Sequence, residues 1–155
     1  MGIGFFVHHN IVSAVKRVEF VSDTVSYIVL RGRWCNIIVR NVHATSEAKS
    51  DDSKDSFYEE LEQVFDHFPK YHTKILLGDF NAKVGRENIF KPTIGNDSLH
   101  QDSNDNGVRI VNFATSKKSV VKSTIFPHQN IRKYTWTSPD GKTHNRIDHI
   151  LTDKR

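Results

Sequence analysis

Residues 74–82 read KILLGDFNA, a short apolar run that turns polar where a buried strand would leave its sheet. In α/β proteins, this end of a strand is where active sites are built. Asp79 can accept a proton from water or help to hold a divalent metal, and the amide of Asn81 can donate to a phosphate oxygen without adding negative charge. The pair therefore suits phosphodiester hydrolysis. An Asx turn that only closes the strand explains the same two residues equally well.

Four β-rich runs precede this strand and predict a meander of neighbouring strands. They cover Gly2–Val7, Ile11–Phe20, Val25–Leu30 and Trp34–Val42. The last run contains the consecutive β-branched residues 37–39, which favour burial on both faces and a position in the middle of the sheet.

Two helices are expected. Apolar residues recur at helical spacing over residues 57–68, and Ser56 and Glu59 can form a capping box at the start of this helix. A second helix is predicted at about residues 108–117. Between the two, residues 86–107 are rich in Asn, Asp, Ser and Gly and carry no predicted regular structure.

Strands return in the last third of the chain, at residues 120–126 and 134–137. The turn Ser138-Pro139-Asp140-Gly141 follows, because Pro presets φ and Gly accepts φ > 0. Residues 146–151 then form the next strand. The sequence thus predicts a hairpin near its end.

The composition limits the class of protein. A chain of 155 residues, 37% of them hydrophobic, is long enough for one domain with a core. Lys and Arg number 22 against 18 Asp and Glu, a mild excess that is compatible with a polyanionic partner. Cys35 is the only cysteine, which excludes an internal disulfide and a thiolate metal cage. With no leader and no apolar run near ~20 residues, we expect an intracellular protein without a membrane span or a disulfide-linked partner.

A second candidate for chemistry is the segment of residues 146–149, Arg-Ile-Asp-His. Strand alternation places Ile147 and His149 on one face and Asp148 on the other. Asp148 could orient a catalytic imidazole and stabilise its cation. A surface ion pair of Asp148 with Arg146 or Arg132 is the simpler explanation from the sequence alone.

A third feature is a group of basic and aromatic side chains around the predicted hairpin, which could grip nucleic-acid phosphates. Two of its aromatic residues are two positions apart, so they share one face and can equally belong to the core while the charges solvate the turn. The group consists of Arg132, Lys133, Tyr134, Trp136, Lys142, His144 and Arg146.

Three motifs in order, Gly-Asp-Phe-Asn-Ala at 78–82, Tyr-Thr-Trp at 134–136 and Ile-Asp-His-Ile at 147–150, resemble the endonuclease/exonuclease/phosphatase superfamily. More narrowly, they are similar to the apurinic-type endonuclease domain of non-LTR retrotransposons and its craniofacial development protein 2-like relatives. The resemblance covers nearly the whole chain, including Asn41–Ala44 and Asn106–Arg109. It implies that residues 1–155 form part of a four-layered α/β sandwich, two mixed β-sheets flanked by helices, truncated at both ends.

The resemblance also implies a nuclear protein that hydrolyses DNA phosphodiesters with Mg²⁺, or Mn²⁺, as cofactor. Asp79 would bind the metal and activate or position the attacking water, Asn81 would bind the scissile phosphate, and Asp148 would orient a catalytic His. The implied substrate contacts are His43, which stands where the wider family usually has Tyr, together with Thr135 and Lys142. Arg146, from the basic group around the hairpin, is a further predicted substrate contact.

Two parts of the family pattern have no counterpart in this sequence. The first is a metal-binding Glu with an upstream Asn, which lie before the part that corresponds to Gly2. The second is a C-terminal strand with the motif Ser-Asp-His. Losing one such group typically costs ~10²-fold or more in rate, so we expect the 155-residue chain by itself to be nearly inactive. Two other functions stay open. One is an inositol-phosphate or phospholipid phosphatase of the same fold, and the other is a non-catalytic remnant that binds DNA or protein.

Overall fold

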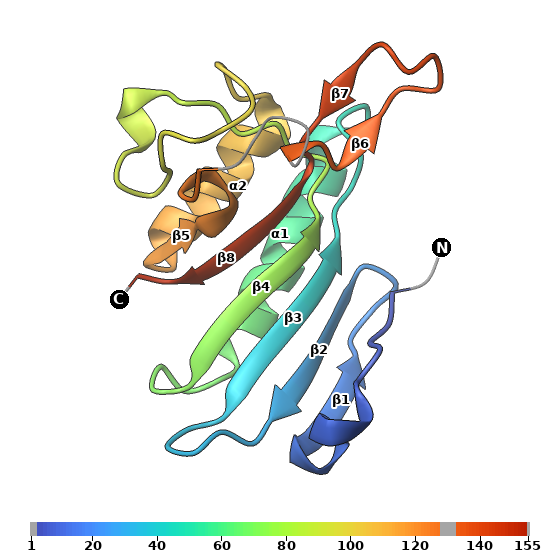
Figure 1. Cartoon of the computed structure of the whole chain (residues 1–155), viewed down its shortest axis with the longest axis vertical. Coiled ribbons are helices and arrows are strands. Elements are labelled where there is room, and N and C mark those ends of the chain that lie inside the picture. The colour runs from blue at the N-terminus through green and yellow to red at the C-terminus, as the bar shows by residue number, and fades with distance from the viewer. Residues whose placement is uncertain (1–2, 128–132, 155) are drawn as a thin grey trace.

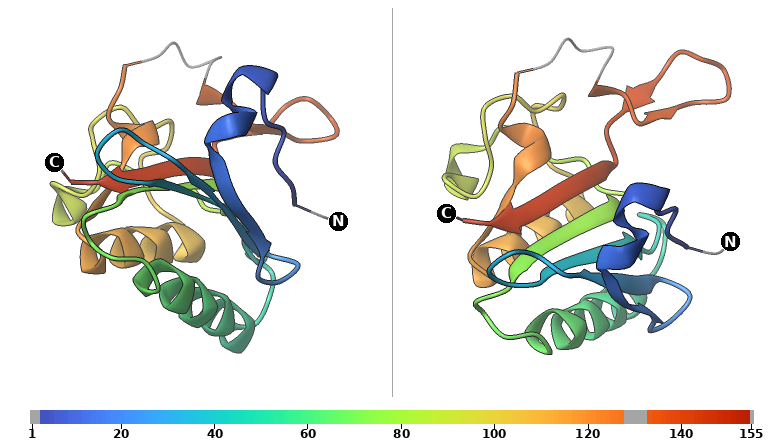
Figure 2. Two further views of the ribbon diagram at one scale, coloured as in Figure 1. Left: turned by 90° about the horizontal axis from the view of Figure 1, so that it is seen from below. Right: turned by 60° about the horizontal axis from the view of Figure 1, so that its bottom comes forward.

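A mixed six-stranded sheet with both α-helices on one face dominates the computed structural model, which describes residues 3–127 and 133–154 (Figures 1 and 2). The strand order is β1-β2-β3-β4-β8-β5. The strands are β1 Val15–Phe20, β2 Val25–Leu30, β3 Ile37–His43, β4 Thr73–Asp79, β5 Ser119–Val121 and β8 Asp148–Asp153. A separate two-stranded sheet pairs β6 Trp136–Thr137 with β7 His144–Asn145. The predicted α/β class is therefore confirmed, and the described residues supply one large sheet and one small one.

The first three strands form the predicted antiparallel meander, while β3 and β4 are parallel and β4 and β8 antiparallel. The meander starts later than predicted. The 3-10 helix η1 His9–Ala14 precedes β1, and residues 3–8 have no regular structure. The apolar and β-branched residues of this region suggested a further strand before β1. In the structure β1 is the edge strand, and its single neighbour in the sheet is β2.

Strand β3 lies in the middle of the sheet, as predicted, between β2 and β4. Its burial alternates, however. Ile38, Arg40 and Val42 are buried under the two α-helices, whereas Ile37 and Val39 are half-buried on the opposite face. The expected burial on both faces is therefore wrong for β3, because the α-helices cover only one side of the sheet (Figure 2).

Both helices begin earlier than their apolar periodicity suggests. Helix α1 spans Asp51–Asp66 and is capped by Ser50, whose hydroxyl accepts the N–H of Ser53, so the predicted capping box at Ser56 is wrong. Helix α2 spans Asp105–Ser116 and is capped by Asn104. The first turns of both helices are polar and carry acidic residues that favour the positive end of the helix dipole, which explains why hydrophobic spacing missed them.

The segment predicted to lack structure contains the short helix η2 Asn88–Phe90, and α2 already begins within its last residues. The next predicted strand is shorter than expected, since β5 passes at once into the 3-10 helix η3 Lys122–Thr124. The hairpin is confirmed, with β6 and β7 in antiparallel pairing, although β8 leaves it to join the large sheet. No helix among residues 3–127 and 133–154 is long and apolar enough to cross a membrane.

Candidate active site

The C-terminal ends of β3 and β4 and the start of β8 lie side by side in the sheet (Figure 1). Three polar residues stand in register there, on the face opposite α1 and α2. His43 is the register partner of Asp79, and Asp79 is the register partner of Asp148. His43 Nδ1 lies 3.6 Å from Asp79 Oδ2, and the two side chains are 38% and 31% exposed. Residues opposed across an antiparallel pair have Cβ atoms ~4.5–5.5 Å apart. The structure thus brings together three of the residues predicted from the sequence.

Gly78 makes the close approach of β3 and β4 possible. Its φ is +143°, and a Cβ at this position would clash with the backbone of Val42 in the neighbouring strand. Only glycine therefore fits immediately before Asp79, which gives a physical reason for the Gly-Asp pair of the motif.

Asn81 follows in the left-handed region, with φ +49°, a conformation that Asn tolerates better than most residues. Its N–H donates to Asp79 Oδ1 over 2.8 Å, so the Asx-type contact considered for this strand end is present. That contact uses Oδ1 and leaves Asp79 Oδ2 facing His43. The amide of Asn81 donates one N–H to the Ala44 carbonyl over 2.9 Å, and an amide carries a second N–H for a ligand.

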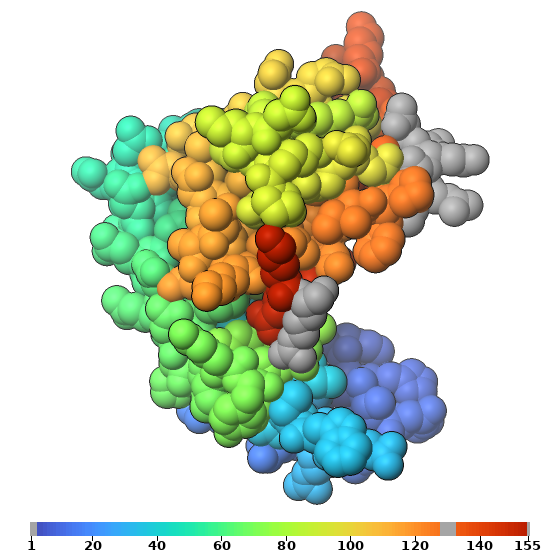
Figure 3. All heavy atoms as spheres, turned by 90° about the vertical axis from the view of Figure 1, so that its left-hand side faces the viewer, coloured from blue at the N-terminus to red at the C-terminus, as the bar shows by residue number. Residues whose placement is uncertain are grey.

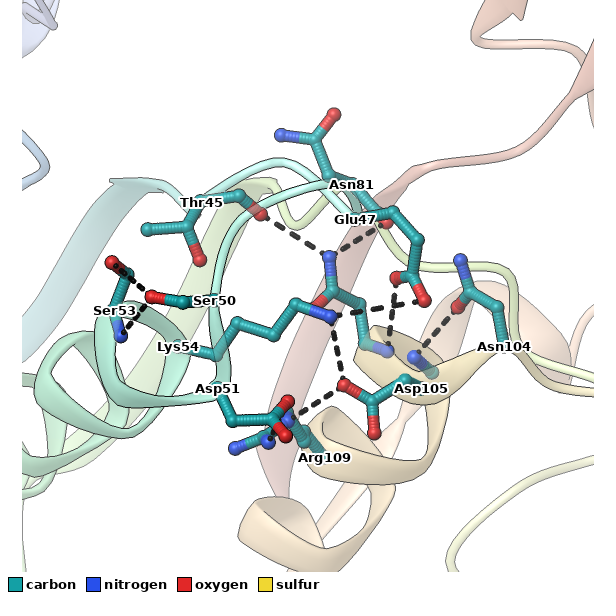
Figure 4. A network of polar contacts seen from close by, with 12 residues as sticks. Thr45, Glu47, Ser50, Asp51, Ser53, Lys54, Asn81, Asn104, Asp105 and Arg109 are labelled. Carbon is teal, nitrogen blue, oxygen red and sulfur yellow. Dashed lines mark hydrogen bonds and ion pairs between the residues drawn. The ribbon is translucent and has the colours of Figure 1, made fainter.

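Asn106, at the start of α2, ties together the loops that follow β3 and β4 (Figure 4). Its side-chain amide is buried and donates to the carbonyl oxygens of Thr45, over 3.2 Å, and Asn81, over 3.1 Å. The next residue, Gly107, approaches Lys83 so closely that a Cβ would clash with its carbonyl oxygen. The N-terminus of α2 therefore fixes the backbone on which Asn81 sits.

A salt-bridge network fastens α2 to α1 below this point (Figure 4). The buried Lys54 donates to Asp105 Oδ2 over 2.9 Å, and Arg109 pairs with Asp105, Asp51 and Asp55. These contacts hold the two helices together at the end that supports the candidate site. Sequence reasoning noted Asn106–Arg109 only as part of the resemblance and missed the function of Asn106 in positioning Asn81.

Asp148 is held from the hairpin side by Thr135. The hydroxyl oxygen of Thr135 accepts the N–H groups of Ile147, over 2.9 Å, and Asp148, over 3.2 Å. Burial raises the pKa of Asp148, a hydrogen bond from Thr135 opposes this shift, and the charge of Asp79 adds to it. Thr135 was predicted to contact phosphate, and in this structure it contacts the Asp148 segment.

His149 lies on the opposite face of β8, as strand alternation predicted. It is buried, with Nε2 2.8 Å from the Ala82 carbonyl and Nδ1 2.9 Å from Ser123 Oγ. Because a carbonyl only accepts, Nε2 carries the proton and Nδ1 accepts from the serine hydroxyl. Burial lowers the pKa of His149 to about 4, so it is neutral at physiological pH. His149 therefore anchors β8 to the residue after Asn81 and cannot be an imidazole oriented by Asp148.

The basic group around the hairpin divides into a buried and an exposed part. Arg146 is buried and donates to the carbonyls of Lys133 and Ser123, and Lys133 is buried in an ion pair with Asp97. These contacts give Arg146 a structural role, and the predicted substrate contact of its guanidinium finds no support in this arrangement. The proposed ion pair of Asp148 with Arg146 is likewise not formed, and Arg132 lies outside the described residues.

The exposed part of the group forms the hairpin surface. Lys142 is exposed at the turn, Tyr134 stacks on His144 with ring centroids 4.4 Å apart, and Trp136 is 41% exposed, so the two aromatic residues do not form a core pair. Trp136 also lines a cleft of about 410 Å³ that runs from the hairpin to the candidate site. The other residues that line it are Glu47, Asn81, Lys83, Asn104, Asn145 and Ile147.

The predicted metal ligand can be tested against the donors at this edge. Within the described residues, no group of three or more His, Cys, Asp or Glu side chains could hold a metal ion. Mg²⁺ is commonly bound through one or two carboxylates while it keeps several waters. Asp79 and Asp148, which is opposite it in the sheet, supply these one or two carboxylates. The remaining Mg²⁺ ligands would be waters or substrate oxygens and not protein side chains.

A sequence profile described as the Endonuclease/Exonuclease/phosphatase family matches residues 1–155. Craniofacial development protein 2 from Bos taurus is 29% identical over 154 residues, which is 99% of this chain and 26% of that protein. Among solved structures, the endonuclease domain of TRAS1, a telomere-specific non-LTR retrotransposon, superposes with a TM-score of 0.55 at 13% identity, covering 84% of this chain and 48% of that one. The AP endonuclease LMAP from Leishmania major gives a TM-score of 0.55 at 13% identity, covering 85% and 46%. The chain thus spans about a quarter of the length of its curated relative.

Proposed function

The chain belongs to the endonuclease/exonuclease/phosphatase family, and from this premise we propose that it is a retroelement-type endonuclease domain that hydrolyses DNA phosphodiesters with Mg²⁺ or Mn²⁺. The observation that carries the proposal is the meeting of His43, Asp79 and Asp148 on adjacent strand ends. Asn81 and an open cleft lie beside them. A nuclear location follows from a DNA substrate.

In the proposed reaction, Asp79 would hold the metal, and its carboxylate would position the attacking water. Asn81 donates an amide N–H to a phosphate oxygen, and its backbone is held by Asn106 so that the donor is oriented before substrate arrives. His43, whose Nδ1 lies 3.6 Å from Asp79 Oδ2, supplies a further donor. The metal, when bound, neutralises the charge that develops on the phosphate oxygens.

The hairpin favours DNA over a small phosphorylated substrate. Trp136 and Lys83 line the cleft, and Lys142 projects from the turn beyond it. Exposed aromatic and basic side chains in a row suit a long polyanion, whereas a small phosphate ester is usually enclosed. The inositol-phosphate phosphatase and the non-catalytic DNA- or protein-binding remnant are therefore the second and third candidates.

A nicking assay on supercoiled plasmid tests the proposal. The 155-residue chain and a longer version with its natural flanking sequence are each incubated with DNA and Mg²⁺, with and without the substitution Asp79→Ala. We expect nicking by the longer version that Asp79→Ala reduces at least ~10²-fold, the usual cost of losing one such group. Nicking that Asp79→Ala leaves unchanged contradicts the assignment.

The same proteins separate the alternatives. Phosphate release from inositol phosphates with intact plasmid would favour the phosphatase. Salt-sensitive DNA binding without cleavage by either version would favour the binding remnant.

A further inference from the structure

A second hollow lies at the opposite end of the large sheet, between the C-terminal ends of α1 and α2 (Figure 3). It opens between the orange residues that end α2 and the green residues that follow α1, beside the red end of β8. Its volume is about 550 Å³, and none of the residues that line it lines the cleft at the candidate active site. We call it the basal cavity. Five lysines line it, namely Lys70, Lys74, Lys117, Lys118 and Lys154.

Arg40 does not line the basal cavity itself but lies behind Phe65 and Phe68, which do. Its side chain is 0% exposed, and its Cζ lies 4.6 Å from the ring centroid of Phe65 and 5.3 Å from that of Phe68, both of which line the cavity. Nη2 donates to the Phe65 carbonyl over 3.2 Å. Nε and Nη1 have no hydrogen-bond partner within the described part of the chain.

The charge around the cavity remains positive after its acids are counted. Arg40 and the five lysines carry six positive charges. Opposite them stand the carboxylates of Asp66 and Asp153, which line the cavity, and that of Glu62 beside it; Asp66 and Glu62 both pair with Lys117. The C-termini of the two helices add roughly half a negative charge each. About two positive charges are left over, which matches a dianion.

Stability alone does not explain a guanidinium at this position. A buried donor without a partner costs folding free energy, and replacing a buried charged group by an apolar one of similar size is often neutral or stabilising. The second buried cation, Lys74, has its Nζ 4.9 Å from the same Phe65 ring. Burial, and after it the charge of Arg40, lower the pKa of Lys74, whereas the charges of Asp153 and Asp66 raise it. An anion bound in the cavity beside Lys74 would offset the repulsion from Arg40.

We propose that the basal cavity binds a small phosphate-bearing anion with at least two negative charges. The lining lysines Lys74, Lys118 and Lys154 bind it, and the buried charge of Arg40 behind Phe65 and Phe68 adds to the attraction without touching the anion. A volume of about 550 Å³ accommodates a nucleotide as well as pyrophosphate. The shared chemistry is the phosphate group, and the site is independent of the proposed nuclease reaction.

Calorimetric titration of the 155-residue chain with pyrophosphate and with ATP, at matched ionic strength, tests the proposal. Saturable one-to-one binding of both is expected. Equal affinities identify phosphate alone as the recognised group, and tighter binding of ATP identifies a nucleotide. Arg40→Met removes a positive charge from behind the cavity wall and should weaken binding severalfold, while the melting temperature without ligand stays the same or rises.

Two exposed positions keep the test decisive if Arg40→Met does not fold. Lys118→Glu, at the mouth of the cavity, should weaken binding severalfold, whereas Lys49→Glu, an equal charge change near the start of α1, should leave it unchanged. Equal losses in these two variants would show non-specific attraction and overturn the proposal. Absence of saturable binding, or binding of a DNA oligonucleotide but of neither small anion, would overturn it too.

Discussion

Protonation of His149 should destabilise the protein as the pH falls. His149 has a pKa of about 4 in the folded chain, because burial disfavours its cation, against 6.5 for an ordinary histidine. Between these values the unfolded chain binds a proton that the folded chain does not, so stability is lost as the pH falls from 6.5 towards 4. At about 1.4 kcal/mol per pH unit, the loss amounts to about 3 kcal/mol. This is a large part of the ~5–15 kcal/mol that stabilises a typical domain.

The matched variant is His149→Gln. The amide of Gln can still donate to the Ala82 carbonyl, which His149 Nε2 contacts over 2.8 Å, but it does not titrate. Urea unfolding of both proteins at intervals from pH 7.5 to pH 4 gives the two stability curves. The wild-type curve should fall by about 3 kcal/mol more than that of the variant over this range.

Other titrating groups are common to both proteins and cancel in the comparison. One of them is His100, whose pKa is lowered mainly by burial, so it acts in the same direction in each. Parallel curves for wild type and His149→Gln would refute the reasoning, because they would show that His149 takes up its proton equally readily in the folded and unfolded chains.

Three further predictions concern the candidate site. Asn106→Asp replaces a donor by a carboxylate oxygen that faces two carbonyl oxygens, and it should lower the free energy of unfolding by roughly 2–4 kcal/mol in urea titrations. The control Asn112→Asp, at an exposed position on the same helix, should change that free energy by less than about 0.5 kcal/mol. Asp148→Asn should leave the urea midpoint unchanged or raise it, because burial and the charge of Asp79 disfavour the Asp148 carboxylate. Plasmid nicking by the longer chain should fall. A lower urea midpoint would contradict this prediction. Lys142→Ala should weaken DNA binding, measured by fluorescence anisotropy, and should reduce the slope of log Kd against log salt concentration by about one. An unchanged slope would show that Lys142 contacts no phosphate.

Local signals predicted most of the sheet. The β-rich run of β2, the apolar run of β4 and the Pro-Asp-Gly turn each depend on neighbours in sequence, and each lies where it was expected. The errors lie where the decisive contact is distant or where polar residues extend an element. The start of α1 depends on the hydrogen bond that the N–H of Ser53 donates to Ser50 Oγ. Nothing in the apolar spacing of residues 57–68 indicates this bond.

The site divides in the same way. The motifs indicated Asp79 and Asp148, but only the β4–β8 register shows that they face each other. Arg146 was assigned to substrate because it lies near the hairpin, and its buried contacts with distant carbonyls could not be seen in the sequence. Asn106 was missed for the same reason, since its two acceptors lie 61 and 25 residues away along the chain.

The two carboxylates and the hairpin belong to different parts of the fold, so the proposed catalytic residues and the proposed DNA-contacting residues lie on separate elements. Asp79 and Asp148 belong to paired strands of the large sheet, while Lys142 stands at the end of a two-stranded ribbon. The ribbon is joined to the site through the Thr135 hydroxyl, which accepts the N–H groups of residues 147 and 148. Substitutions at the ribbon tip can therefore alter DNA contacts without moving the carboxylates, whereas loss of the Thr135 hydroxyl should disturb both at once.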